Sequence, residues 1–296
     1  MKKKKSKSFD TGTGIGNFIK NNPLYIAWFV MYFMFTWAMF GRNIGSFVMT
    51  FTGYMVSLLL ILSEPGEHIL RFIYRVRQLE TKREKYYLIP MFKEVYATAA
   101  KRHPELRRDI EICIIDEMRI NACAMGLRTI AVTKGAIDSL SEEELKGFMA
   151  HELGHISHGD TIALLLTTVG NGVLTIVIVA AKTAMNIIRS MLDTRGFAGV
   201  ILNLLNLWFH IMLFYILYVG EFLMAINSRR NEYAADRFAF EIGYGDDLVS
   251  ALYLLQDMSI SDNARLSDRL KASHPHIAKR IGRLEYMVDE ADAGQR

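Results

Sequence analysis

The chain is poor in cysteine, proline and tryptophan, with two, five and three copies among 296 residues. Cys113 and Cys123 lie ten positions apart without a CxxC pair, so we expect neither a disulfide framework nor a cysteine-built metal site. This pattern favours reduced thiols that face the cytosol. A hydrophobic content of 51% with so few prolines rules out a disordered or collagen-like polymer. The placement of the apolar residues therefore decides the class of protein.

Charged residues are missing from four long apolar windows, and this absence indicates an integral membrane protein. Each window holds 21 or 22 residues without Lys, Arg, Asp or Glu, and a helix needs about 20 apolar residues to span a bilayer. Only Arg42 separates the first window from the second, so these two form a helical hairpin. The last two windows form a second hairpin. The four predicted transmembrane helices are residues 21–41, 43–63, 161–181 and 199–220.

Basic residues place the polar parts of the chain on the cytoplasmic side. Residues 1–20 hold six lysines, and residues 64–85 hold six further Lys and Arg residues, which agrees with the positive-inside rule. The connection at 182–198 carries three cations against one acid and is a weak counter-signal. A basic N-terminus before a membrane span favours contact with lipid over contact with nucleic acid. We expect a multi-pass protein of the cell (cytoplasmic) membrane with both termini in the cytoplasm.

The chain is predicted to alternate between polar and apolar segments. The polar segments are expected to contain both helices and strands, so the protein as a whole is an α+β membrane protein. A helical segment at 86–103 ends at Pro104. Three β-rich runs follow so closely that a small antiparallel sheet is expected from residues 110–115, 120–125 and 129–133. The divisions are a basic N-terminus (1–20), a first hairpin (21–63), a polar section (64–160), a second hairpin (161–220) and a second polar section (221–296).

The first polar section ends in an HExxH motif on a predicted helix. Ser141, followed by three glutamates, is an N-cap with an acidic first turn, so the helix begins there. Residues four apart share a helical face about 6 Å apart. His151 and His155 can therefore bind one Zn²⁺, with Glu152 beside them as a base. Because such a motif arises by coincidence in about one chain in a hundred of this length, a third ligand is needed.

A pair of acids follows the fourth apolar window. Glu232 and Asp236 share one helical face, so Glu232 can supply the third ligand and Asp236 can accept a hydrogen bond from a liganding imidazole. Taken alone, this pair is explained better as part of a solvent-exposed acidic face than as part of a metal site, because three arginines lie nearby: Arg229, Arg230 and Arg237. Together with the upstream HExxH motif, a His2Glu metal site is favoured.

Four segments of the chain, HELGHISHGD, NEYAAD, NACAMG and SHPHIAKRI, resemble the HtpX family of membrane zinc metalloproteases, gluzincins related to the CAAX prenyl protease. The resemblance covers nearly the whole chain, because the family also inserts its second hydrophobic hairpin between the first and second of these motifs. It implies a cytoplasmic zincin-type metalloprotease domain with one Zn²⁺ per chain, held by His151, His155 and Glu232. It also implies that Glu152 is the general base and that Asp236 orients His151.

The same resemblance assigns residues around the metal. NACAMG matches the family's edge strand, along which an extended substrate adds by main-chain hydrogen bonds, although a simple core strand is compatible with it. His274 matches the histidine that donates to the oxyanion, and Arg280 supports the site, but Pro275 equally fits a turn before a helix. The implied substrate-binding residues are Asn121, Ala122, Cys123 and Ala124.

Two further histidines receive no metal in this interpretation. His158 lies three residues after His155, without the intervening glutamate of the motif. His210 lies in the middle of the fourth window, where an ionisable group is a candidate for function. A neutral imidazole that bonds to a neighbouring helix, near Asn203 or Asn206, is the simpler expectation for His210.

By resemblance, the expected function is zinc-dependent cleavage of membrane or misfolded proteins at the cytoplasmic membrane face, in membrane protein quality control under stress. The expected partners are protein substrates and the lipid bilayer, and not nucleic acid. A channel or transporter is an alternative, but the apolar windows lack paired acids and broken helices. A non-catalytic membrane scaffold stabilised by zinc is another, and it would close its site with four ligands and have no need of Glu152.

Overall fold

The computed structural model divides the chain into two compact units. The unit of helices and sheet, called the mixed unit here, comprises Met1–Pro23, Arg71–Ala163 and Asn227–Arg296. The helical unit comprises Leu24–Leu70 and Leu164–Ile226. The structure describes residues 16, 18–20, 23–39, 43–170, 179–180, 183–184, 186–187, 196–214, 218, 220–261 and 277–294.

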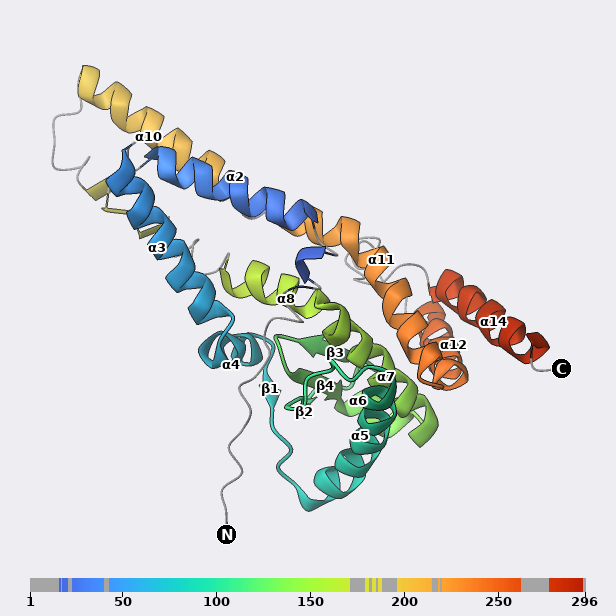
Figure 1. Cartoon of the computed structure of the whole chain (residues 1–296). Helices are drawn as coiled ribbons and strands as arrows, with labels where there is room; N and C mark the ends of the chain where they lie inside the picture. Colours follow the sequence, from blue (N-terminus) through green and yellow to red (C-terminus); the bar gives the residue numbers. More distant parts are fainter. Residues whose placement is uncertain are drawn as a thin grey trace, which may run out of the picture. The chain divides into compact units, whose positions relative to one another are not determined.

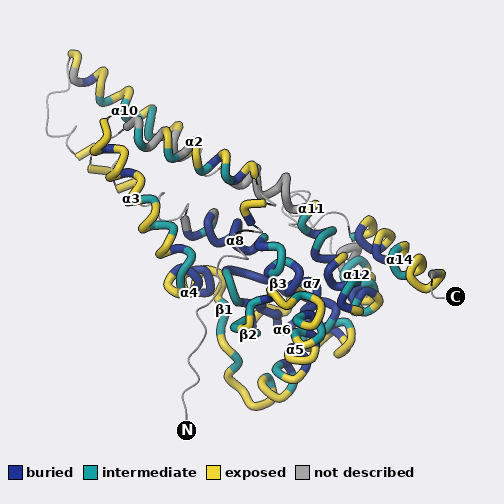
Figure 2. Tube along the Cα trace, viewed as in Figure 1, coloured by how far each residue is buried: buried dark blue, intermediate teal, exposed yellow. Residues whose placement is uncertain are grey.

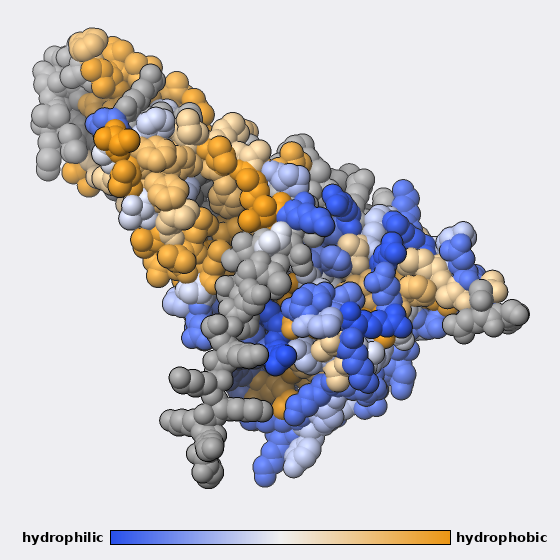
Figure 3. Space-filling view, viewed as in Figure 1, coloured by the Kyte–Doolittle hydropathy of each residue, from blue (hydrophilic) through white to orange (hydrophobic). Residues whose placement is uncertain are grey.

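Apolar helices make up the helical unit (Figure 1). They are α2 (Pro23–Met39), α3 (Ile44–Ile61) and α10 (Phe197–Phe214). Large apolar side chains are exposed on them, such as Val48, Leu59 and Leu204, and hydrophobic surface gathers over these helices in Figure 3 while much of their length is exposed in Figure 2. A water-soluble surface rarely carries apolar patches of this extent, whereas a lipid-facing surface does.

The number of membrane spans predicted from the sequence is supported only in part. Among the described residues, α3 alone is long and apolar enough to cross a membrane, and Gly199–Ile211 within α10 is a shorter apolar helix. The α2 helix has 17 residues. Much of the third predicted window, at 171–178, and of the connection after it, at 188–195, lies outside the described residues. Four transmembrane helices therefore remain a prediction.

Aromatic side chains pack α2 against α3, as the first predicted hairpin requires. The ring of Phe33 on α2 contacts three rings of α3 edge to face, with centroid separations of 5.5, 6.3 and 5.6 Å to Phe47, Phe51 and Tyr54. Edge-to-face pairs of this kind contribute about 0.5–1.5 kcal/mol each beyond the burial of their area. The two helices are thus joined by side-chain packing as well as by the short connection between them.

A short helix, α4 (Glu64–Ile73), follows α3 after a sharp corner. A Cβ atom on Gly66 would lie 1.9 Å from the carbonyl oxygen of Ile61, so the corner accepts only glycine. At the other end of α4, the Arg71 Nε donates to the Thr129 hydroxyl oxygen at 2.8 Å, and its Nη1 lies 3.0 Å from a carboxylate oxygen of Glu111. Arg71, which belongs to the mixed unit, is therefore held at the sheet.

The described strands form a mixed sheet of order β1-β2-β4-β3. The strands are β1 (Val76–Arg77), β2 (Glu111–Ile115), β3 (Ala122–Met125) and β4 (Thr129–Thr133). β1 pairs with β2 and β3 with β4 in antiparallel fashion, whereas β2 and β4 are parallel. All five residues of β4 are buried, which agrees with its central position.

The prediction of an antiparallel sheet is thus wrong for the pair β2 and β4, which is parallel, and the prediction did not include β1. Gly126, with φ 62°, begins the tight turn that makes β3 and β4 a hairpin. After β2, the chain does not place β3 next to β2 but leaves room for one strand between them. β4 fills that position and runs parallel to β2. β1 has two residues, too few for a periodic signal in the sequence.

In the mixed unit, α5 (Lys82–Arg102), α6 (Lys134–Ser139) and α7 (Glu142–His158) pack against this sheet (Figure 1). α12 (Gly245–Ser261) packs against α7, and α14 (Ile277–Gly294) packs against α12. Two helices have residues in both units: α8 (Asp160–Leu165), together with the π-helix Leu166–Gly170 that continues it, and α11 (Gly220–Glu241). α5 begins four residues before the predicted segment, because Thr81 and Glu84 form a capping box at its start. The core includes Leu88, Val95, Ile130, Val132, Met149, Leu153 and Leu248.

Candidate metal centre and active site

The α7 helix carries the HExxH motif and is defined at both ends by its sequence. Ser141 accepts a hydrogen bond from the Glu144 N–H at its N-terminus, and Glu144 bonds back to the Ser141 N–H, which completes a capping box. Gly159 ends the helix in the left-handed conformation, with φ 78°. His151 and Glu152 are buried and His155 is partly buried, so the motif faces the interior.

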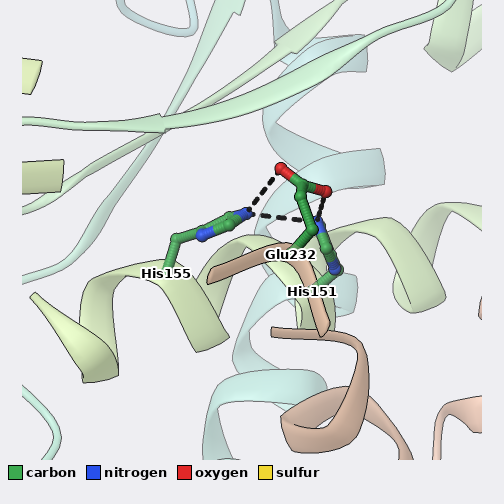
Figure 4. Close-up of side chains that lie close together, drawn as sticks. All are labelled: His151, His155 and Glu232. Atoms are coloured by element: carbon green, nitrogen blue, oxygen red, sulfur yellow. Dashed lines mark hydrogen bonds and ion pairs between the residues drawn. The ribbon is translucent and has the colours of Figure 1, made fainter. Parts of the chain in front are cut away.

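His151, His155 and Glu232 come together from two helices, α7 and α11 (Figure 4). The Nε2 atoms of the histidines lie 3.2 Å apart, and Glu232 oxygens lie 3.4 Å from His151 Nε2 and 3.6 Å from His155 Nε2. Ligand atoms about 2.0–2.1 Å from a tetrahedral zinc ion are about 3.3–3.4 Å apart. Two imidazole nitrogens and a carboxylate oxygen at these separations fit one zinc ion.

Gly154 allows α11 to approach α7 closely enough for this arrangement. A Cβ atom at position 154 would lie 2.9 Å from the Cα of Ala235, in the backbone of α11. Ala235 lies three residues after Glu232, so the close approach is less than one helical turn from the third candidate ligand. Gly147 allows a similar approach between α7 and α12, where a Cβ atom would lie 2.5 Å from the Leu248 nitrogen.

Asp236 and Arg280 form a buried charge network behind His151. Asp236 Oδ1 lies 2.9 Å from His151 Nδ1, and Arg280 on α14 donates to both Asp236 oxygens at 2.6 and 2.9 Å. Arg280 Nη1 also lies 2.9 Å from a Glu232 oxygen. Burial raises the pKa of Asp236, but its hydrogen bond to His151 and the charges of His151 and Arg280 together lower that pKa. Asp236 is therefore a carboxylate that can hold the His151 ring.

Asp160 is a corresponding partner for the second histidine, and the sequence reasoning missed it. Its Oδ2 lies 3.1 Å from His155 Nδ1. Because Gly159 ends α7 and turns the chain, the next residue packs against the last turn of the helix. The signal was present in HELGHISHGD, where a Gly-Asp pair follows the motif directly. Carboxylates of this kind fix the tautomer and orientation of a liganding imidazole.

Negative charge exceeds positive charge at this centre. The described carboxylates around the two imidazoles are those of Glu152, Glu232, Asp160 and Asp236, whereas the cation Arg280 forms ion pairs with two of them, Glu232 and Asp236. Burial and Arg280 lower the pKa of His151, but hydrogen bonds to Asp236 and Glu232 outweigh them and raise it to about 9. The net negative charge of the centre thus favours the binding of a cation. A divalent metal ion matches both the donor atoms and the negative charge of the site.

Glu152 lies between the metal ligands and strand β3. One of its carboxylate oxygens accepts a hydrogen bond of 2.5 Å from the Ala124 N–H. Among the described strands, β3 stands at the end of the sheet order, so its outer side faces away from β4. Burial, followed by the charges of Glu152 and Glu117, raises the pKa of the Cys123 thiol to about 12. Cys123 is therefore a neutral thiol near the centre, and the candidate base meets the predicted substrate strand.

The other candidate residues divide into placed and unplaced ones. His274 and Pro275 lie outside the described residues. His158 Nδ1 lies 2.7 Å from the Gly154 carbonyl oxygen, and His210 Nδ1 lies 2.8 Å from the Asn206 carbonyl oxygen of its own helix. Neither histidine belongs to the cluster of possible ligands among the described residues.

Comparison with known proteins agrees with this site. The model of peptidase family M48 matches residues 83–288, which is more than half of the chain. The chain belongs to peptidase family M48. As an M48 metallopeptidase, it shares 31% of residues over 201 positions with a protease HtpX homolog of Desulfotalea psychrophila, and the match covers 59% of this chain and 67% of that protein. A protease HtpX of Shewanella oneidensis is 27% identical over 193 residues, with the same coverage of both chains.

A solved structure shares the fold of this M48 chain. The crystal structure of S. mikatae Ste24p superposes with a TM-score of 0.50 at 22% identity, and the alignment covers 92% of this chain. The present chain spans 66% of the length of that structure. The resemblance to the HtpX family and its relatives that the four motifs indicated is confirmed.

Proposed function

We propose that this membrane metalloprotease is a zinc-dependent endopeptidase with one Zn²⁺ per chain. The observation that carries the proposal is the convergence of His151, His155 and Glu232, with donor atoms within 4.8 Å of one another and Glu152 directly after His151 on α7. The ligand set of two histidines and one glutamate is that of catalytic zinc sites, which keep a fourth position open. A structural site would close that position with a fourth protein ligand.

Several residues of the chain have separate roles in the proposed reaction. A bound zinc ion supplies Lewis-acid polarisation of the scissile carbonyl and acidifies the attacking water. Glu152 accepts the proton of that water and delivers it to the leaving amine nitrogen. Asp236 and Asp160 hold the two imidazoles through their Nδ1 atoms, so that Nε2 of each ring points to the centre.

The substrate lies extended along the outer side of β3 in this proposal. The main chain at Asn121, Ala122, Cys123 and Ala124 pairs with the peptide, which places a scissile bond beside Glu152. His274 donates to the oxyanion that develops on the carbonyl oxygen, as the resemblance implies. Arg280 acts as a positioning residue, because its guanidinium contacts Glu232 and Asp236.

Membrane or misfolded proteins are the proposed substrates, cleaved at the cytoplasmic face as part of membrane protein quality control. The exposed apolar helices of the helical unit support a location in the bilayer. An edge strand supports a broad choice of substrate, because main-chain hydrogen bonds make little demand on side chains. Extended or unfolded segments should therefore be cut and folded ones spared.

The test compares variants that separate chemistry from metal binding. Glu152→Gln should retain stoichiometric zinc by elemental analysis and lose hydrolysis of unfolded casein, because the amide cannot accept the proton of the water. Glu232→Ala should lose zinc and activity together, whereas Asp236→Ala and Asp160→Ala should weaken zinc binding about 10- to 100-fold. Full activity of Glu152→Gln would overturn the proposed mechanism, and full zinc content of Glu232→Ala would overturn the ligand set.

A further inference from the structure

A groove lies along the edge of the sheet opposite to β3. β1 pairs with β2 only at Ile114 and Ile115, so the first half of β2 is left uncovered on that side among the described strands. The groove between this part of β2 and α5 has a volume of about 540 Å³. The N–H of Glu111 donates toward β4, to the Arg128 carbonyl, and main-chain groups alternate in direction along a strand. The N–H and carbonyl of Ile112 therefore point into the groove.

The charged side chains of the groove are mostly cationic. Lys85 and Lys93 of α5 and Arg108 before β2 line it, and none of them forms an ion pair within the described part of the chain. The acid on the groove wall, Glu111, is paired with Arg71 at 3.0 Å. The groove thus presents three uncompensated positive charges around an exposed strand edge.

The floor of the groove is apolar, and its spacing matches an extended chain. Leu79, Ile89, Phe92 and Tyr96 contribute apolar surface. Lys85 and Lys93 are eight residues apart on α5, which corresponds to about 12 Å along a helix. Side chains four residues apart on one face of a strand are about 13 Å apart. Two acidic side chains at such positions would therefore reach the two lysines together.

We propose that this groove is an exosite that binds an extended acidic segment of a protein substrate by adding a strand to β2. The acidic side chains contact Lys85, Lys93 and Arg108, and the segment's main chain bonds to Ile112. A lipid headgroup could satisfy the cations, but it has no alternating N–H and carbonyl groups for the strand edge. The role as an exosite rests on the proposed protease function, whereas binding itself does not.

Binding is therefore measured on the inactive full-length Glu152→Gln variant in uncharged detergent. A fluorescein-labelled peptide Glu-Val-Thr-Val-Glu, with its two acids four positions apart, should bind saturably in fluorescence anisotropy. Lys85→Glu or Lys93→Glu should weaken binding at least 10-fold. Lys101→Glu is the matched control, since Lys101 is exposed on α5 outside the groove, and it should change binding less than 3-fold.

Two peptides methylated on alternate main-chain nitrogens test strand addition, because only every second N–H of an added strand faces β2. One methylated peptide should bind like the parent and the other at least 10-fold more weakly. Equal binding of both would overturn strand addition, and binding unaffected by Lys93→Glu would overturn the site. If phosphatidylglycerol vesicles bind through Lys93 and the acidic peptide does not, the groove is a lipid contact and the proposal fails.

The active chain gives an independent measurement of the exosite role. A casein-derived peptide that carries the acidic segment at one end should show a higher KM in Lys93→Glu with unchanged kcat, whereas the peptide without the segment should be cut equally by both. If the parent chain hydrolyses neither peptide but the acidic peptide still binds, the protease proposal is wrong and the groove remains a binding site for acidic peptides. Unchanged KM for both peptides would remove the exosite.

Discussion

Arg280 is the residue on which the charge balance of the metal centre depends. It is 4% exposed and contacts two buried carboxylates, those of Glu232 and Asp236. Removing one partner of a buried ion pair costs about 3–5 kcal/mol, because the remaining charge stays buried without compensation. Asp236 has a lowered pKa, so it stabilises the folded chain above its ordinary pKa of 3.8, and this stabilisation is lost as the pH falls through the lowered value.

Replacement of Arg280 should therefore reduce stability and change its dependence on pH. We expect Arg280→Met to lower the free energy of unfolding by about 3–5 kcal/mol at pH 7. Without the guanidinium the pKa of Asp236 moves up toward its ordinary value of 3.8, so the stability that Asp236 loses as the pH falls below 3.8 should become smaller. Thermal unfolding between pH 2 and 8 measures both effects. Lys279→Met, at an exposed position of the same helix, should stay within about 0.5 kcal/mol of the parent, and equal behaviour of the two variants would contradict the network.

At the scale of elements, the distance between α7 and α11 sets the metal site. We expect Gly154→Ala to destabilise the chain by about 1–3 kcal/mol and to weaken zinc binding, because its Cβ atom would meet the backbone of α11 at Ala235. Gly282→Ala in α14 is the matched control, since nothing lies within 4 Å of its added Cβ atom. It should be neutral or stabilise by up to about 1 kcal/mol. A zinc titration with thermal unfolding compares the two, and unchanged zinc affinity in Gly154→Ala would show that the approach is not needed.

The orientation of β3 determines which position tests the substrate strand. The Ala124 N–H points outward to Glu152, so that of Ala122 also points outward, whereas that of Cys123 faces Ala131 in β4. Ala122→Pro removes an outward N–H and should lower kcat/KM for an unfolded peptide at least 10-fold while zinc is retained. Ala122→Ser keeps the N–H and should remain active. Parental kcat/KM in the proline variant would exclude pairing along this strand.

Local signals of the sequence predicted some elements well. β4 has the predicted bounds, and α7 begins at the predicted cap, because a serine followed by glutamates and a buried apolar run act within a few residues. The convergence of His151, His155 and Glu232 was also predictable, because an HExxH motif needs a third ligand and the later motif offers an acid. The parallel pairing of β2 with β4 was not, because no motif marks which strands become neighbours. The resemblance assigned Arg280 to the site, but its ion pairs with Glu232 and Asp236 were not predicted.

For the whole molecule, the membrane topology remains the main prediction from the sequence. Cysteine introduced at Ser190 should react with a membrane-impermeant maleimide in intact cells, whereas cysteine introduced at Asp289 should react only after lysis. The native thiols give little background, since Cys113 is buried and the pKa of Cys123 is raised to about 12. Labelling at position 289 in intact cells would contradict the cytoplasmic location of the C-terminal section.

The two segments that provide the ligands are far apart along the chain. His151 precedes the second apolar hairpin and Glu232 follows it, so an ion shared by them closes a loop of about 80 residues, and closure of a loop this long removes much of the conformational freedom of an unfolded chain. The ion would act as a reversible cross-link as well as a reagent. Chelation should then release α11 from α7, and protease cleavage within residues 227–241 should become faster before the sheet is lost.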